Sequence, residues 1–158
     1  MSEITVYTDG AASGNPGPGG YGIILKSGHH YKEISRGFRL TTNNRMELLA
    51  VIVALETIRI KKSTVTIYTD SRYVCDAVEK GWLKEWEKKR FKKKKNIDLW
   101  QRFLVIARKH SIKFQWIKGH SNIPENERCD FLAVQASQQK NLGVDEGYIE
   151  ENEQEQIW

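Results

Sequence analysis

Apolar and β-branched residues alternate with polar ones near the start of the chain, a pattern typical of strands. Residues 3–9 predict one strand, and residues 21–27 and 30–38 predict two more, joined by a tight turn at 27–29. Residues 14–20 (GNPGPGG) separate the first two strands, and their composition predicts a loop. We therefore expect an antiparallel meander of three strands.

The pattern changes to that of a buried helix in the middle of the chain. Apolar residues spaced three and four apart fit a broad apolar face on a helix within residues 41–60, which Thr42 or Asn43 can cap. Residues 63–70 follow as a strand apolar enough to be buried on both faces. Residues 71–86 then predict one or two short helices.

The last third of the chain continues the alternation of helices and strands. A helix that opens at Asn96 or Asp98 is followed by an alternating strand at residues 112–118, and Pro124 lies near the start of a last helix. This order predicts an α/β fold with a mixed sheet, antiparallel at one edge and parallel elsewhere, and with helices on its faces.

Length and composition limit the class of protein. A chain of 158 residues suits one domain, and 39% hydrophobic residues are enough for a packed core. We expect a cytoplasmic protein without a membrane contact, because the chain has no long apolar run and its first residues lack the features of a signal peptide. Two cysteines, Cys75 and Cys129, are too few for a disulfide framework, so we expect buried thiols.

Charge is distributed unevenly around a net value of +5. Residues 84–95 hold eight Lys or Arg and two Glu, whereas the residues after Lys140 include acids and no base. A basic body predicts a polyanionic partner. We expect residues 143–158 to be a disordered, flexible acidic tail; the alternative is that this tail lies on the basic segment and competes with nucleic acid.

Four acids stand where a predicted strand ends or a predicted helix begins: Asp9, Asp70, Glu47 and Asp130. If the strands that precede Asp9 and Asp70 are parallel neighbours, their carboxylates lie side by side at one edge of the sheet. Such an all-oxygen ligand set favours Mg²⁺ or Mn²⁺ and chemistry on phosphates. The alternative for any single one of these acids is a turn former or helix cap.

Five motifs, in order from about residue 4 to residue 137, resemble type 1 ribonuclease H of the bacterial form: YTDGAASGNPGPGGYG, TTNNRMELLAVIVALE, YTDSRYV, NIDLWQR and WIKGHSNIPENERCDFLA. The resemblance implies a five-stranded mixed sheet of order 3-2-1-4-5 with helices on both faces, in a catalytic domain of residues 1–142. It also implies hydrolysis of the RNA strand of RNA–DNA hybrids with two Mg²⁺ or Mn²⁺ ions, which leaves 5′-phosphate and 3′-hydroxyl ends.

The same resemblance assigns roles to the acids. Asp9 is expected to bridge two metal ions, Glu47 and Asp70 to hold one of them and orient the attacking water, and Asp130 to hold the other. His120 corresponds to the family's mobile-loop histidine, which helps proton transfer or product release. The alternative for His120 is an ordinary exposed loop residue.

Substrate contacts are also assigned by the resemblance. The RNA strand is expected to lie on the glycine-rich loop and on the asparagines at the start of the long helix: Ala12, Gly14, Asn15, Asn43 and Asn44. The alternative for the asparagines is helix capping. Residues 81–95 correspond to the family's basic protrusion, which grips the DNA strand, and the candidates there are Trp82, Lys84, Trp86, Lys88, Lys89 and Arg90. The tryptophans can instead anchor this segment to the body.

Thr42, Arg45 and Lys84 are further candidates for contacts with a DNA phosphate. Three features depart from the family pattern: Arg72 stands where glutamine is frequent, the basic protrusion is shorter and richer in lysine, and the residues SNI after His120 differ from the commonest form of that loop. Arg72 is expected to contact a phosphate or a base. Two rival functions stay open, a non-catalytic module that binds hybrids or double-stranded RNA, and a nuclease or strand-transfer enzyme that acts on DNA. We expect a monomer.

Overall fold

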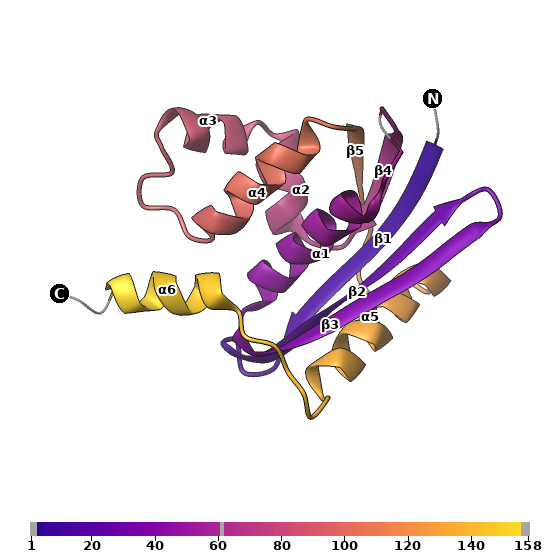
Figure 1. The fold of residues 1–158 in the computed structure, drawn as a ribbon. Helices are drawn as coiled ribbons and strands as arrows, with labels where there is room; N and C mark the ends of the chain where they lie inside the picture. Colours follow the sequence, from indigo (N-terminus) through magenta and orange to yellow (C-terminus); the bar gives the residue numbers. More distant parts are fainter. Residues whose placement is uncertain (1–2, 61, 156–158) are drawn as a thin grey trace.

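The computed structural model of the protein describes residues 3–155 apart from residue 61. Five strands form one sheet: β1 (Glu3–Ala12), β2 (Gly17–Ser27), β3 (His30–Thr41), β4 (Thr64–Thr69) and β5 (Ser111–Trp116). Their order is β3-β2-β1-β4-β5, antiparallel from β3 to β1 and parallel from β1 to β5 (Figure 1). The predicted mixed sheet and its order are confirmed.

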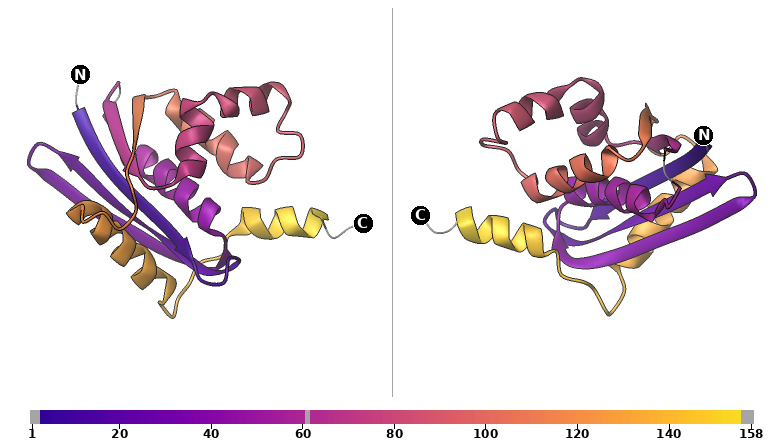
Figure 2. Two further views of the ribbon diagram at one scale, coloured as in Figure 1. Left: turned by 180° about the vertical axis from the view of Figure 1, so that it is seen from behind. Right: turned by 45° about the horizontal axis from the view of Figure 1, so that its top comes forward.

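The helices cover both faces of the sheet. They are α1 (Asn43–Thr57), α2 (Arg72–Glu79), α3 (Trp82–Lys88), α4 (Ile97–Ala107), α5 (Pro124–Ser137) and α6 (Glu146–Glu155). Helix α1 packs on β1 and β2 and carries α4 on its outer side, whereas α5 packs on the opposite face of the same strands (Figures 1 and 2). Among the described residues, no helix is long and apolar enough to cross a membrane.

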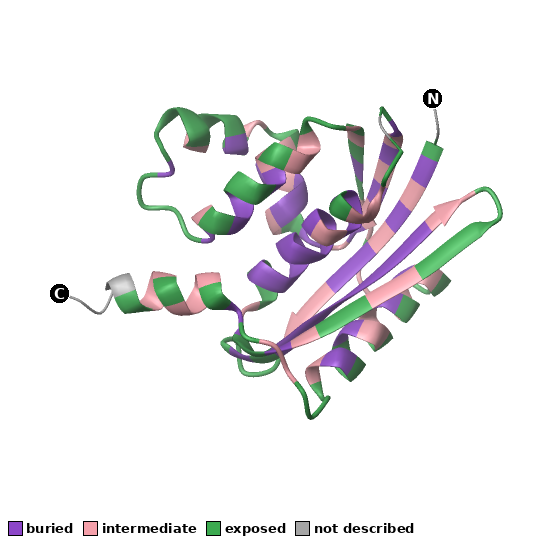
Figure 3. Ribbon diagram, in the orientation of Figure 1, coloured by how far each residue is buried: buried purple, intermediate pink, exposed green. Residues whose placement is uncertain are grey.

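Helix α1 is the centre of the core. Met46, Leu48, Val51, Ile52 and Leu55 are all inaccessible to solvent because the helix lies between the sheet and α4. A helix enclosed in this way is apolar nearly all round, which explains why the sequence shows a broad face and not a narrow stripe. In Figure 3 the buried colour accordingly concentrates on α1 and the central strands, while the α3–α4 connection is mostly exposed.

Only part of the glycine-rich segment forms a loop. We predicted a loop over 14–20, but β2 already begins at Gly17. Glycines continue into this strand because α5 packs directly on it: a Cβ on Gly22 would lie 2.3 Å from the carbonyl oxygen of Cys129. The composition therefore reflects close packing of a helix on a strand as well as a turn.

Two other expectations are settled by the structure. Residues 71–86 form two short helices, which Gly81 separates with a φ of 77°. Cys75 and Cys129 are both buried and unpaired, as expected.

The C-terminal segment is not the disordered tail that we predicted. Gly143 pairs with β3 through its N–H to the carbonyl of Gly37, at 2.9 Å, and residues 146–155 form α6. Residues 156–158 lie outside the described part of the chain. The acidic composition suggested a tail without contacts to the body. One acid of this segment, Asp145, is instead buried immediately before α6 and attaches the segment to the body.

Asp145 belongs to a buried ion network around Arg45. The Arg45 side chain is 1% exposed; its Nε and Nη2 donate to Asp145 at 2.7 and 2.9 Å, and Nη1 and Nη2 donate to Asp98 at 2.8 and 2.7 Å. Thr41 donates to the same Asp145 carboxylate at 2.7 Å. These bonds connect the start of α1 to the start of α4 and to the segment that leads into α6.

We predict that Arg45→Ala lowers the free energy of unfolding by about 3–5 kcal/mol, because it leaves buried Asp145 without a counter-charge. Denaturant titration measures the change. Arg102→Ala is the matched control: it removes a bidentate pair with Glu56 that is partly open to solvent, so about 1 kcal/mol or less is expected. Equal losses in the two variants would contradict the importance of the buried network.

Candidate active site

The pairing of β1 with β4 brings two of the predicted acids together. These strands are parallel and in register up to Tyr7 and Tyr68, whose rings stack at 4.9 Å. Asp9 lies two residues beyond Tyr7, and Asp70 follows the last residue of β4. We expected Asp9 at the end of its strand. Instead, β1 continues to Ala12, where it pairs with β2 alone. The two carboxylates still meet where β1 and β4 diverge.

Glu47 joins them from α1. A Cβ on Gly10 would come within 2.5 Å of the backbone nitrogen of Glu47, so only glycine at this position lets α1 lie directly on β1. As a result, carboxylate oxygens of Asp9, Glu47 and Asp70 lie within 4.8 Å of one another. We expected Asp130 near the start of a helix, but it lies in the middle of α5; it lines the same cavity, of about 370 Å³. All four predicted acids therefore gather in one place.

Burial and mutual repulsion raise the affinity of these carboxylates for protons. Burial is the main cause for Asp9, and the charge of Asp70 adds to it, raising the pKa of Asp9 to about 8. Burial likewise raises the pKa of Glu47, with the charges of Asp9 and Asp70 adding to it. Burial raises the pKa of Asp70 too, although the neighbouring His120 opposes this rise. The ionised cluster is thus unfavourable by itself and calls for a bound cation.

The donor set fits a hard divalent cation. Its atoms are all carboxylate oxygens, which suit Mg²⁺ and Mn²⁺. Among the described residues, Glu47 Oε2 is buried without a hydrogen-bond partner, although a buried polar atom normally has one. A metal ion held by Glu47, Asp9 and Asp70 would satisfy this atom.

His120 lies on the loop between β5 and α5. Its side chain is 80% exposed, its φ is +55°, and its Nδ1 lies 4.0 Å from Glu127 Oε1. The loop passes close to the acids, because a Cβ on the preceding Gly119 would lie 2.8 Å from Asp70 Oδ2. His120 is thus near the cluster but outside it, and its exposure leaves its role a prediction.

The family model for RNase H matches residues 1–138. The chain belongs to the ribonuclease H family. This family consists of metal-dependent endoribonucleases.

The similarity to individual members extends over nearly the whole chain. A ribonuclease H of Desulforamulus reducens is 56% identical over 150 residues, covering 92% of this chain and 94% of that protein. Ribonuclease HI of Synechocystis sp. is 48% identical over 153 residues, with 93% and 95% covered.

Among solved structures, LC9-RNase H1, a type 1 RNase H with the type 2 active-site motif, has a TM-score of 0.79 and 30% identity, with 95% of this chain and 80% of that chain covered. LC11-RNase H1 in complex with an RNA/DNA hybrid has a TM-score of 0.64 and 27% identity, with 84% and 95% covered.

In this ribonuclease H, the asparagines beside the acids also shape the protein itself. Asn15 Oδ1 accepts from the backbone N–H of Asn43 at 2.9 Å, and Asn43 Oδ1 accepts from the N–H of Ala12. These bonds tie the loop around Gly14 to the start of α1. Helix capping falls to Thr42, whose hydroxyl accepts from the N–H of Arg45 at 3.2 Å, and not to Asn43.

The side chain of Asn44 is exposed, and Asn44 lines the cavity of the acids. By contrast, the expectation that Arg45 contacts a DNA phosphate is wrong. Its guanidinium group is buried and occupied by Asp98 and Asp145, so it holds the scaffold together.

The basic protrusion is anchored by aromatic residues and leaves its cations exposed. Trp86 packs on Trp100 with ring centroids 5.7 Å apart, and Phe91 is buried, so these aromatic residues anchor the segment. Trp82 is 44% exposed. Four candidate basic residues of the segment are exposed to solvent: Lys84, Lys88, Lys89 and Arg90. The protrusion is thus held by aromatic packing and presents cations outward.

Arg72 lines the acid cavity, and its guanidinium group stacks on the ring of Trp116, a contact that the sequence did not indicate. Its guanidinium lies 3.8 Å from the centroid of the Trp116 ring, and Trp116 Nε1 donates to the carbonyl of Asp70 at 3.0 Å. Trp116 thus links a metal-ligand candidate to the arginine beside it. The only hint in the sequence was a tryptophan at the end of an alternating strand.

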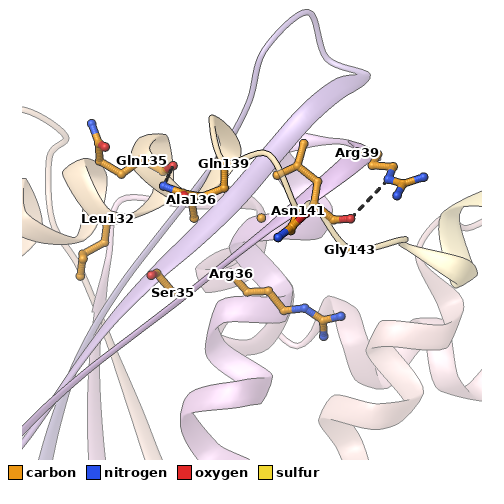
Figure 4. Close-up of a pocket in the computed structure, with 11 residues that line it drawn as sticks. Ser35, Arg36, Arg39, Leu132, Gln135, Ala136, Gln139, Asn141 and Gly143 are labelled. Atoms are coloured by element: carbon orange, nitrogen blue, oxygen red, sulfur yellow. Dashed lines mark hydrogen bonds between the residues drawn. The ribbon is translucent and has the colours of Figure 1, made fainter.

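A second cavity, of about 480 Å³, lies between β3, the end of α5 and the segment 141–143 (Figure 4). Arg36 and Arg39 line it, and Arg39 Nε donates to the carbonyl of Leu142 at 3.3 Å. None of the predicted site residues lines this cavity. It has no part in the site formed by the acids.

We predict that Asp9→Asn stabilises the metal-free protein at pH 8 by on the order of 2–4 kcal/mol and has little effect at pH 4. The pKa of the Asp9 carboxyl is raised to about 8 in the folded state. The folded protein therefore loses stability as pH rises from the pKa of this carboxyl in the unfolded chain through 8, and the variant, which has no carboxyl there, does not. Unfolding in EDTA at both pH values measures it.

Two controls accompany this experiment. Mg²⁺ added to the unaltered protein at pH 8 should recover much of the same stability, since the cation offsets the repulsion. Glu87→Gln, on the exposed side of α3, should show no such pH dependence. A stability of Asp9→Asn that follows the unaltered protein at every pH would exclude the repulsion described above.

Proposed function

We propose that this ribonuclease H hydrolyses the RNA strand of RNA–DNA hybrids internally, using two Mg²⁺ ions, with Mn²⁺ as an alternative, and leaving 5′-phosphate and 3′-hydroxyl ends. The observation that carries the proposal is the convergence of Asp9, Glu47 and Asp70 within 4.8 Å, with Asp130 lining the same cavity. The hybrid bound by the relative LC11-RNase H1 supports the choice of substrate.

The residues divide the work according to position. Asp9 interacts with all three other acids, Asp70, Glu47 and Asp130, and is therefore suited to be the ligand shared between two ions. Glu47 and Asp70 would orient the attacking water, and Asp130 would complete the ligand set on the side of the leaving 3′-oxygen. When bound, divalent ions at such a site supply a polarised phosphate and an activated water. His120 would accept a proton or assist product release from its exposed loop.

Recognition of the RNA strand would use the loop that precedes β2 and the start of α1. Asn43 and Asn44 line the cavity of the acids, and Ala12 and Asn15 are hydrogen-bonded to Asn43. Gly14 lies between Ala12 and Asn15 on the same loop. RNA differs from DNA in its 2′-hydroxyl groups, which such donors and acceptors can contact in the wide minor groove. Thr42 and Arg72 are proposed as phosphate contacts.

Two rival functions are less well supported. A module that only binds nucleic acid has no use for carboxylates whose ionised forms repel one another in a buried cluster. A nuclease that acts on DNA would share the acids. The cleavage experiment below distinguishes it by its substrate.

We predict that the protein cleaves labelled hybrids in Mg²⁺ and leaves double-stranded DNA and EDTA-treated samples intact. Asp9→Asn should lower the cleavage rate by about 10³-fold or more, because it removes a ligand from the metal site. Asp76→Asn, an acid of α2 paired with Lys80 outside the cavity, is the matched control and should retain activity. Cleavage of duplex DNA, or hybrid cleavage that persists in EDTA, would refute the proposal.

We also predict that the basic protrusion contributes phosphate contacts. Lys88→Gln/Lys89→Gln should weaken hybrid binding and reduce the slope of log Kd against log salt by roughly 1–2. The reason is that a phosphate without its lysine contact keeps its bound counterion, so fewer ions are released on binding. Lys32→Gln/Lys109→Gln removes the same charge at the end of the sheet opposite the acids, near the starts of β1 and β5, and should leave the slope nearly unchanged. Equal slopes in both double variants would exclude a grip by the protrusion.

A further inference from the structure

Helix α6 is docked on the body beside the predicted substrate groove. Arg45 and Thr41 both donate to Asp145 just before the helix. A Cβ on Gly147 would lie 2.0 Å from Asp98 Oδ2, so the first turn of α6 sits directly on the buried ion network. Figures 1 and 2 show the helix alongside the chain that leads from α3 into α4. Its position is therefore fixed at its N-terminal end.

A cavity of about 280 Å³ separates α6 from residues that we propose to contact substrate. The cavity is formed by three parts of the chain that are far apart in sequence: Asn15, Thr42 and Asn44 on one side, Lys95 and Asn96 at the end of the basic protrusion, and Glu151 on α6. Because all three parts line one cavity, a nucleic-acid strand that contacts the first and second parts would lie close to the third. Helix α6 is thus part of the groove and not a remote appendage.

An anion already occupies one position in this cavity. Glu151 Oε1 accepts from the backbone N–H of Asn96 at 3.0 Å. Asn96 is the N-cap residue of α4, where the helix dipole also favours negative charge, and its side chain does not cap the helix.

The Asn96 side chain is instead bonded to the Tyr73 hydroxyl at 3.1 Å, and its oxygen accepts from Arg45 at 3.4 Å. Asn96 is therefore held rigidly, with its N–H directed at a carboxylate.

The distribution of charge suggests that Glu151 and a nucleic-acid phosphate compete for the Asn96 N–H. Residues 84–95 are strongly basic, and α6 carries acids and no base. We propose that Glu151 is a built-in competitor for a backbone phosphate of the hybrid: it takes the Asn96 N–H in the free protein, and the phosphate displaces it on binding. The proposal rests on hybrids being the substrate. Glu151 thereby sets the affinity of the groove without touching the acids that perform the chemistry.

Binding of a short hybrid in EDTA tests the proposal, with two matched variants that each remove one negative charge from α6. Glu151→Gln should tighten binding by about three- to tenfold, because a neutral amide competes poorly with phosphate. Glu153→Gln, exposed on the same helix, should change Kd by less than about twofold. Equal tightening would overturn the proposal in favour of a general charge effect, and weaker binding of Glu151→Gln would show instead that Glu151 supports the substrate.

The Asn96 amide provides a direct readout. Inorganic phosphate should shift its ¹H–¹⁵N resonance at lower concentration in Glu151→Gln than in the unaltered protein, and the hybrid should shift it in both. An Asn96 resonance that is insensitive to phosphate and to hybrid in both proteins would overturn the proposal. Cleavage by the unaltered protein is scored separately, so a failure of the proposed function is distinguishable from a failure of this competition.

Discussion

The repulsion among Asp9, Glu47 and Asp70 is the constraint on which the arrangement of this ribonuclease H depends. Parallel pairing of β1 with β4 places two of the carboxylates side by side, and the packing of α1 on Gly10 adds the third. Core residues flank both contacts, among them Val6, Ile67 and Met46, so burial of apolar residues holds the acids together against their own charge. The core therefore stores an unfavourable cluster that a bound cation relieves.

A second buried cluster follows the opposite rule. Arg45 is surrounded by Asp98 and Asp145, and its charge is compensated within the protein. The compensated cluster ties β3, α1, α4 and α6 together, whereas the uncompensated one is open to a cavity. The Arg45 cluster supports the fold because its buried charges have partners within the protein. The three acids have no such counter-charge and are therefore available to a ligand.

The sequence correctly suggested the positions that are decided within one strand or helix. Asp9 lies in β1, Asp70 directly follows β4, and Glu47 and Asp130 lie in α1 and α5, so their approach to one edge could be expected once the sheet order was known. The role suggested for Arg45 was wrong because it was assigned from its neighbours in the TTNNRME motif. Its actual partners lie 53 and 100 residues further along the chain. Nothing in the local pattern distinguishes an arginine that will be buried from one that will face solvent.

The amino-acid sequence by itself determined the strands, the long buried helix and the elements that carry the four carboxylates, because these depend on local periodicity and residue type. Only the tertiary structure decided that Arg45 holds the scaffold together, that Trp116 carries Arg72, and that the acidic segment becomes a helix bonded to Asn96. These outcomes depend on pairs of residues that are distant in sequence. The free energy of such a pair exists only once the fold has removed both partners from water and placed them in contact.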